Sequence, residues 1–331
     1  MPDFVDSMFY VGETPWHGKG IPLQEPPTIY EALTQADLDW DVFKCPTYFK
    51  IGLHGEDQIA TDHYVTVRAT ENGIVPIGNV GQRYEVLQNK DAFIPFEPML
   101  DWGFTLETAG SIGNGKRVWI LAKSPDRYTV GDDAMQHYVF LYTSHDGSSG
   151  NCIRDTMVRV VCQNTLNLAL GKNDSTFDYS LRHTVSIKDK ILELRDKIAE
   201  NKGNIVVAVG KMNKMVDYPF NEEQASKYFE HVIPFLAGRG VKTDNELGIR
   251  RRDVATPVYD QLMTNFVTGQ GNKGESLWDA YNAVTEYYDH QKVYKDWVQA
   301  TQFGRASDYK TRAFRIAKQL VDNQPVINAI A

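Results

Sequence analysis

The segment FTLETAGSIGNGKRVWILAK, residues 104–123, determines much of the fold. Its two ends, residues 104–109 and 116–123, hold apolar residues that alternate with polar ones or run together, as strands require. Between them lies GSIGNG, residues 110–115, whose glycines suit the tip of a hairpin. We therefore expect an antiparallel hairpin with a mobile and accessible tip.

The sequence before this hairpin predicts a second, smaller sheet. Residues 42–51, 59–69 and 74–80 are rich in β-branched and aromatic residues. Asn72 and Gly73 supply turn chemistry between the last two of these segments. We expect a small antiparallel layer over residues 42–80.

Helices are expected on both sides of the hairpin. Residues 28–40 begin with a capping-box pattern and carry apolar residues at helical spacing, and residues 91–100 follow a suitable capping residue. Residues 138–144 predict a third strand, and residues 156–170 predict a helix that Gly171 ends. The expected order over residues 90–171 is therefore helix, three strands, helix.

The remainder of the chain has a helical pattern. The fold class is therefore α+β, with antiparallel sheets and packed helices in the N-terminal part and a mostly α-helical C-terminal part. We expect two domains, residues 1–180 and 181–331. The expected C-terminal helices cover residues 187–216, 222–236, 254–268, 276–290 and 307–323.

Composition favours a folded protein inside the cell. The chain has 331 residues, of which 42% are hydrophobic, so it can build real cores. Its apolar runs are too short to cross a membrane, and the first ten residues lack the pattern of a signal peptide. Cys45, Cys152 and Cys162 are too few and too spread for a disulfide framework, and we expect buried thiols. The expected location is the cytoplasm of a bacterial host, with no membrane partner.

Charge is unevenly distributed along the chain. The net charge is −8, which by itself argues against binding a polyanion. Residues 1–150 hold 10 Lys and Arg against 21 Asp and Glu, whereas the remaining residues hold 25 against 22. A polyanion would therefore bind mainly to the second half and to its border with the first.

Three strings carry a resemblance to a known family: PWHGKG at residues 15–20, MVRVVCQNTLNLALG at 157–171 and LWDAYNAVTEYYDH at 277–290. In this order and spacing they resemble a phage- and plasmid-borne family that carries a domain of unknown function. The expected order of helix, three strands and helix is also similar in topology to single-strand annealing proteins of the Red-beta, RecT and Erf superfamily. That likeness implies binding of single-stranded DNA, homo-oligomers and no need for a nucleotide cofactor.

Basic residues of the middle of the chain are the candidate site. If the sheet and helix pack in the expected order, several cations gather in one groove beside Trp119, Tyr138 and Tyr142. Cations with nearby aromatic rings suit a single strand, because they bind phosphates and offer faces to unstacked bases. We therefore expect nucleic-acid binding and strand annealing, without a catalytic residue, metal or other cofactor. The candidate residues are Lys116, Arg117, Lys123, Arg154, Arg159, Arg182 and Lys273.

Two functions other than strand annealing are alternatives. One is a metal-dependent enzyme acting on nucleic acid, for which the sequence offers only histidines and carboxylates at unspecific spacing, such as His137 and His145. The other is an accessory protein that binds a host protein, with the acidic first half acting as a DNA mimic.

A GxGxxG string at residues 269–274 follows a helix and not a strand, so we interpret it as a loop.

Two further motifs allow both a structural and a functional interpretation. The loop over residues 15–20 either anchors a core through Trp16 or contacts a ligand, and His17 has no partner nearby in sequence that would make it catalytic. Residues 277–290 favour packing through their apolar face, which leaves a polar set for other roles. The polar set is Asn282, Glu286, Asp289 and His290.

A second basic set lies near the C-terminus. It includes Arg250, Arg251, Arg252, Arg305, Lys310, Arg312, Arg315 and Lys318.

Overall fold

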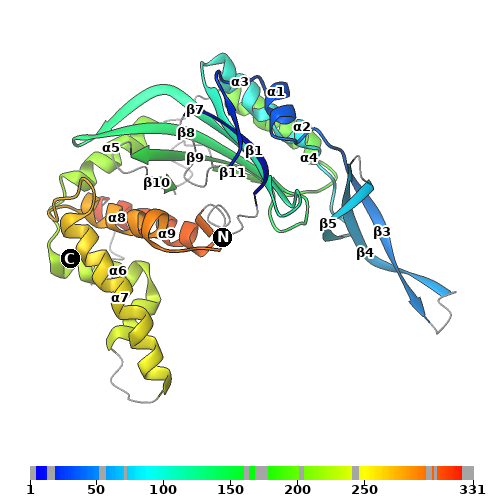
Figure 1. The fold of residues 1–331 in the computed structure, drawn as a ribbon. Coiled ribbons are helices and arrows are strands. Elements are labelled where there is room, and N and C mark those ends of the chain that lie inside the picture. The colour runs from blue at the N-terminus through cyan, green and yellow to red at the C-terminus, as the bar shows by residue number, and fades with distance from the viewer. Residues whose placement is uncertain are drawn as a thin grey trace.

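A computed structural model describes most of the chain and shows an α+β protein (Figure 1). Strands dominate the N-terminal part and helices the C-terminal part, so the expected fold class is confirmed. Residues 13–18, which hold Trp16 and His17, lie outside the description. The described residues are 5–12, 19–51, 57–70, 73–159, 164–167, 178–200, 205–240, 246–295, 300–301 and 304–322.

The main sheet is mixed and runs in the order β10-β9-β8-β7-β6-β1-β2, with β11 paired to β9. β1 and β2 are parallel, and the other neighbours are antiparallel. The strands are β1 (Val5–Val11), β2 (Ile21–Leu23), β6 (Thr105–Ile112), β7 (Arg117–Val130), β8 (Asp133–Ser144), β9 (Asn151–Arg159), β10 (Asn164–Asn167) and β11 (Asp178–Leu181).

The hairpin predicted from the central segment is β6 and β7. Gly113, Asn114 and Gly115 make its tip with φ of 67°, 62° and 83°, a region that glycine adopts without strain. The tip is not accessible as a whole, because Gly115 is buried against the ring of Trp40. Gly110 lies within β6, where a Cβ would come within 2.7 Å of the Trp119 ring. The missing side chain at Gly110 thus lets Trp119 lie flat across the neighbouring strand.

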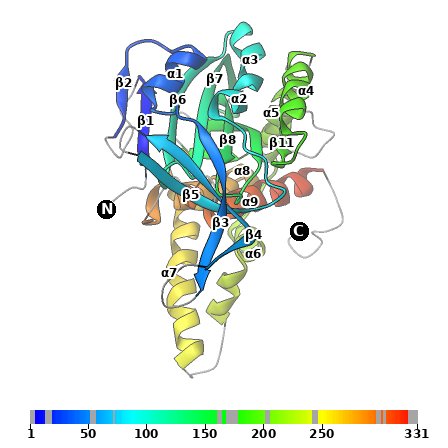
Figure 2. The ribbon, with the colours of Figure 1, turned by 90° about the vertical axis from the view of Figure 1, so that its right-hand side faces the viewer.

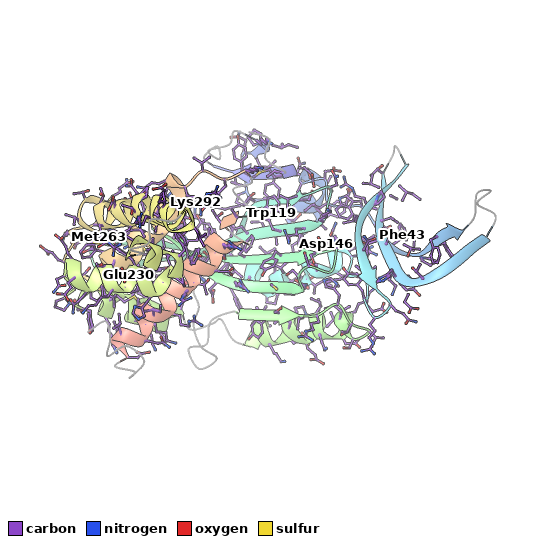
Figure 3. All side chains as sticks on the ribbon, turned by 90° about the horizontal axis from the view of Figure 1, so that it is seen from below. Phe43, Trp119, Asp146, Glu230, Met263 and Lys292 are labelled. Atoms are coloured by element: carbon purple, nitrogen blue, oxygen red, sulfur yellow. The ribbon has the colours of Figure 1, made fainter. Side chains whose placement is uncertain are left out.

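A separate sheet extends from the body as an arm, formed by β3 (Val42–Ile51), β4 (Asp57–Thr70) and β5 (Gly73–Gly81) in that order. This is the small antiparallel layer expected from the sequence. The arm lies at the opposite end of the molecule from the helical part, as the labels Phe43 and Met263 show (Figure 3). At its base, the Thr66 hydroxyl donates to the His145 backbone oxygen at 2.6 Å.

Helices cover one face of the main sheet. Ile120, Leu141 and Ile153 point into this face from β7, β8 and β9 and are fully buried. A capping box of Thr28 and Glu31 starts the first helix, as expected. The covering elements are α1 (Ile29–Gln35), α2 (Asn89–Ala92), η1 (Ile94–Phe96), α3 (Glu97–Asp101) and α4 (Ile187–Glu200).

The prediction of a helix over residues 156–170 is wrong for the described residues. β9 occupies them up to Arg159, and β10 occupies Asn164–Asn167. Ile153 and Met157 are buried in the cores, while Arg154 on the intervening face is exposed, which is the alternation of a strand. The β-branched residues that follow Met157 also favour a strand over a helix. The order helix, three strands, helix is therefore not observed.

The helical part packs around a second core at the far end of the sheet (Figure 2). Val130, Met135 and Met157 from the sheet join this core, whereas α4 belongs to the sheet core. The division at residue 180 therefore stays a prediction. No described helix is long and apolar enough to span a bilayer. The elements are α5 (Ile205–Val216), α6 (Glu222–Val232), η2 (Pro234–Gly240), α7 (Glu246–Thr268), α8 (Leu277–Glu286), the π-helix η3 (Tyr287–Gln291) and α9 (Arg305–Val321).

Candidate functional site

Two of the predicted cations meet at a small pocket on the face of the sheet opposite to α1–α4. Arg117 begins β7 and Arg154 lies in β9, while Tyr142 of β8 lies between their strands. The pocket has a volume of about 200 Å³. Its lining residues, which we call the arginine pocket, are Arg117, Tyr142, Ser148, Ser149, Arg154, Ser307 and Asp308.

Strand register explains why these side chains share a face. Tyr142 pairs with Trp119 on β7 and with Cys152 on β9, and alternate residues of a strand point to the same side. Arg154, two residues after Cys152, therefore extends toward Tyr142, and its guanidinium carbon lies 5.7 Å from the centre of the Tyr142 ring. The pocket is thus a consequence of alternation along three adjacent strands.

Tyr142 is protonated at neutral pH. Burial raises the pKa of its hydroxyl to about 12, and the neighbouring Cys152 adds to the rise, while Arg154 acts in the opposite direction. A protonated phenol can donate a hydrogen bond as well as accept one. Tyr142 therefore adds a neutral hydroxyl, and not a negative charge, to the lining of the arginine pocket.

The loop after β8 supplies hydroxyl groups to the pocket. The Ser144 hydroxyl and Ser149 hold the loop by hydrogen bonds of 2.7 and 2.8 Å, and the Asp146 carboxylate accepts the Ser148 amide at 2.9 Å. Arg117 donates to the Ser148 hydroxyl at 3.1 Å. A Gly-Ser-Ser-Gly loop between strands is typical of a backbone that can approach a ligand.

The first turn of α9 closes the pocket with Ser307 and Asp308. Gly304 precedes this helix, and no side chain caps the first amides of α9. The positive end of the helix dipole favours a negative group here. Asp308 occupies this position in the structure, so a carboxylate already lies beside the arginines. Only the fold reveals this contribution, since α9 is about 150 residues away from Arg154 in the chain.

Lys116, Lys123 and Arg182 do not line the arginine pocket. Lys116 is exposed at the hairpin tip beside Arg117. Lys123 is on the same sheet face, but its amine pairs with Glu107 at 2.7 Å. Arg182 is exposed after β11, and the side chain of Arg159 lies outside the description. Among the predicted cations with described side chains, the structure therefore brings Arg117 and Arg154 to one pocket. Lys116 is next to Arg117 in the chain, and Lys123, Arg182 and Lys273 lie elsewhere.

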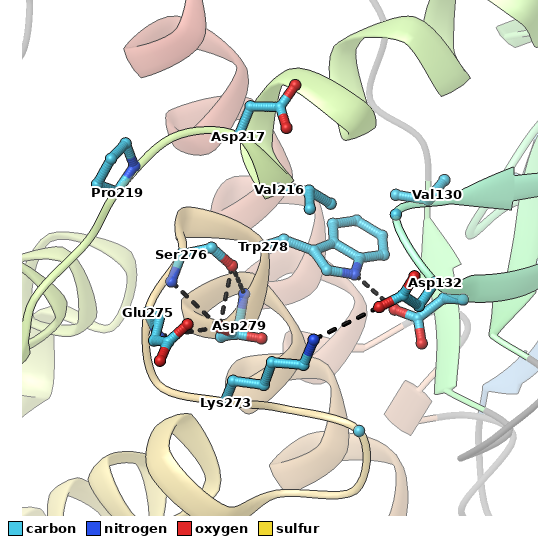
Figure 4. A pocket seen from close by; sticks show the side chains of 13 residues that line it. Val130, Asp132, Val216, Asp217, Pro219, Lys273, Glu275, Ser276, Trp278 and Asp279 are labelled. Carbon is cyan, nitrogen blue, oxygen red and sulfur yellow. Dashed lines mark hydrogen bonds and ion pairs between the residues drawn. The ribbon is translucent and has the colours of Figure 1, made fainter.

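Lys273 lines a different pocket of about 430 Å³ between the sheet and the helical part (Figure 4). Its amine pairs with Asp132 at 3.4 Å, and the Trp278 indole donates to Asp133 at 2.8 Å. The lining also includes Asp217, Glu275 and Asp279, so carboxylates outnumber the single lysine. This pocket does not suit a polyanion.

A buried ion pair lies one turn further along α9. The Lys310 amine and the Asp289 carboxylate are 2.6 Å apart, with side chains 0% and 1% exposed. Lys310 belongs to the C-terminal basic set of the sequence, but its amine is buried in this pair. Ala306, Ala313 and Phe314 flank Lys310 at helical spacing and are buried too. This helical spacing of apolar residues around Lys310 predicts from the sequence that Lys310 faces the core.

Histidines and cysteines have local partners or lie outside the description. His137 and Asp155 form a buried pair at 2.6 Å, and His145 contacts the Asn89 carboxamide oxygen at 2.8 Å. Cys152 is buried as expected, Cys45 is half-buried, and Cys162 is not described. In the part of the chain that the structure describes, no group of three or more His, Cys, Asp or Glu side chains is arranged to hold a metal ion.

The fold and the arginine pocket define an α+β protein with two arginines beside a small pocket on one face of its sheet. A family model described as Domain of unknown function (DUF932) matches residues 76–320. The chain belongs to that family. A search of curated proteins found no match, and a search of solved structures found none either. The matched region includes the arginine pocket and both strings that form β9–β10 and α8–η3.

Proposed function

We propose that this protein binds single-stranded DNA and that the arginine pocket holds a backbone phosphate. The observation that carries the proposal is the meeting of Arg117, Arg154 and Tyr142 at one pocket. Guanidinium groups bind phosphate through paired N–H donors, and hydroxyl groups add further donors. Such contacts fix a strand in place without reading its sequence.

The exposure of the aromatic residues supports an outward orientation of the bases. Tyr142 and Trp119 are only 7% and 5% exposed, so their rings pack inside the sheet layer and offer little area for stacking. A strand held by its phosphates, with few aromatic faces beneath it, keeps its bases accessible for pairing. This is the arrangement that strand annealing requires, and it needs no nucleotide.

The finer parts of the proposal are an annealing role in recombination, a phage or plasmid origin and a homo-oligomeric assembly. The topological likeness to annealing proteins does not support them, because the expected second helix is replaced by β9 and β10. Support comes from the pocket and from the resemblance of the three sequence strings to phage- and plasmid-borne proteins.

The direct test measures binding of a fluorescent 30-nucleotide strand by polarisation over a salt series. We expect affinity that falls steeply with salt, with log K decreasing by roughly 0.7 per log unit of salt for each phosphate bound. Arg117→Gln and Arg154→Gln should weaken binding and each reduce this slope. Lys227→Gln on α6 removes a surface cation that pairs with Glu223 away from the arginine pocket, and it serves as the control.

Four outcomes would redirect the proposal. No binding by the wild-type chain at low salt would overturn it, as would unchanged binding in both arginine variants. Strand cleavage that depends on a divalent ion would favour the metal-dependent enzyme. Specific binding to a host protein without affinity for the strand would favour the accessory protein with an acidic first half.

A further inference from the structure

We infer that the exposed face of α9 extends the arginine pocket into a track, so that the ligand is a strand of several nucleotides and not a mononucleotide. This inference rests on the proposed function. The face begins at the pocket with Asp308 and carries Arg312 and Arg315. Arg315 is exposed and Arg312 is partly exposed, whereas the opposite face of the helix is buried.

Helical geometry places these arginines in line with the pocket. Residues 308, 312 and 315 follow one another at spacings of four and three, so their side chains lie on one side of α9. With a rise of about 1.5 Å per residue, Arg312 and Arg315 lie roughly 6 and 10 Å along the helix from Asp308. These steps are comparable to the distance between successive phosphates of an extended strand.

The buried face of α9 fixes this orientation. Ala313, Phe314 and Ala317 are 0% exposed and belong to the helical core, and Lys310 forms its ion pair on the same side. Rotation of the helix would remove both the apolar packing and the charge pairing. The arginines of the exposed face are therefore held toward solvent by the core beneath them.

Lys292 and Arg305 add positive charge near the start of α9. Burial lowers the pKa of Lys292, and the nearby positive charge of Arg305 lowers it further. The Lys292 amine lies 5.2 Å from the ring centre of Tyr288 and 5.7 Å from that of Tyr294. Lys292 lies between the helical part and Trp119 of the sheet (Figure 3). Adjacent like charges repel, and a polyanion along α9 would relieve this repulsion.

The test combines strand length with charge removal. Oligothymidylates of 4, 8, 12 and 16 nucleotides are titrated against the wild-type chain and Arg312→Gln/Arg315→Gln. We expect the wild-type chain and the variant to bind the shortest strand with nearly equal affinity. The affinity of the variant should rise less with strand length than that of the wild type. For the 16-mer the salt slope should fall by about 1.4, so that between 50 and 200 mM salt the variant loses about sevenfold less affinity than the wild type.

The matched control removes two cations on the opposite side of the sheet, by Lys188→Gln/Arg195→Gln on α4. This control changes net charge equally and should keep the wild-type dependence on length. If the α9 variant behaves like this control while the wild type binds DNA, the track is overturned and the proposed function stands. If the wild type binds no strand of any length, both are overturned.

Discussion

The two charged regions at the start of α9 differ in the exposure of their cations. Arg154 of the arginine pocket is exposed, and its neighbour Asp308 is exposed too. Lys310 and Asp289, one turn away, are buried almost completely and pair at 2.6 Å. In water, a cation can exchange its partner for a phosphate at little cost, but in a core it cannot be separated from its partner. Burial therefore separates Arg154, which stays accessible to a ligand, from Lys310, whose charge serves the packing of the core.

Breaking the buried pair should have the largest effect. Lys310→Met leaves the Asp289 carboxylate buried without its cation, and we expect the free energy of unfolding to fall by about 3–5 kcal/mol. Denaturant titration followed by circular dichroism measures this loss. A loss of less than about 1 kcal/mol in the free energy of unfolding would contradict the assigned role of the pair.

A double replacement separates the charge effect from packing. Lys310→Met with Asp289→Leu removes both charges, so no uncompensated group stays in the core. We expect this variant to be more stable than Lys310→Met alone. Equal stability of the two variants would indicate that lost packing, and not the unpaired carboxylate, causes the destabilisation.

His145 extends the comparison to a buried ring whose contact is the neutral Asn89 side chain. Burial lowers its pKa to about 3, and the nearby His183 lowers it further while Asp146 acts in the opposite direction. Above pH 6.5 the ring is neutral whether the chain is folded or unfolded. Below pH 6.5 only the unfolded chain takes up the proton, so stability is lost progressively down to about pH 3.

The expected loss from His145 is about 2 kcal/mol between pH 7 and pH 5. Denaturant titrations at these two values measure it. His145→Gln keeps a hydrogen-bonding group near Asn89 but cannot titrate, so its stability should depend less on pH over this range. An equally steep dependence in the variant would assign the acid sensitivity to other groups.

The smallest effect is expected at the exposed carboxylate of the arginine pocket. Asp308→Asn removes a negative charge that competes with phosphate, so affinity for single-stranded DNA should rise by roughly two- to fivefold. Polarisation titrations at low salt measure this change. The rise should shrink as salt is added, because exposed charges are screened. Weaker binding would indicate that Asp308 orients the arginines and does not compete for them.

The sequence predicted most of the architecture through local patterns. The hairpin, the arm strands and the capping box at Thr28 follow from residues close together in the chain. The segment from Thr156 misled the prediction because its apolar residues satisfy helical spacing as well as alternation, and pairing with β8 decides in favour of the strand. Asp308 and Ser307 could not be assigned to the site, since only tertiary packing brings α9 to the sheet.

The base of the arm has a mechanical consequence. Gly78 of β5 lies against the backbone of Asp146, with no room there for a side chain. Asp146 begins the loop whose serines line the arginine pocket. We therefore expect a sideways displacement of the arm to reach, through this contact, the loop that holds Ser148 beside Arg117.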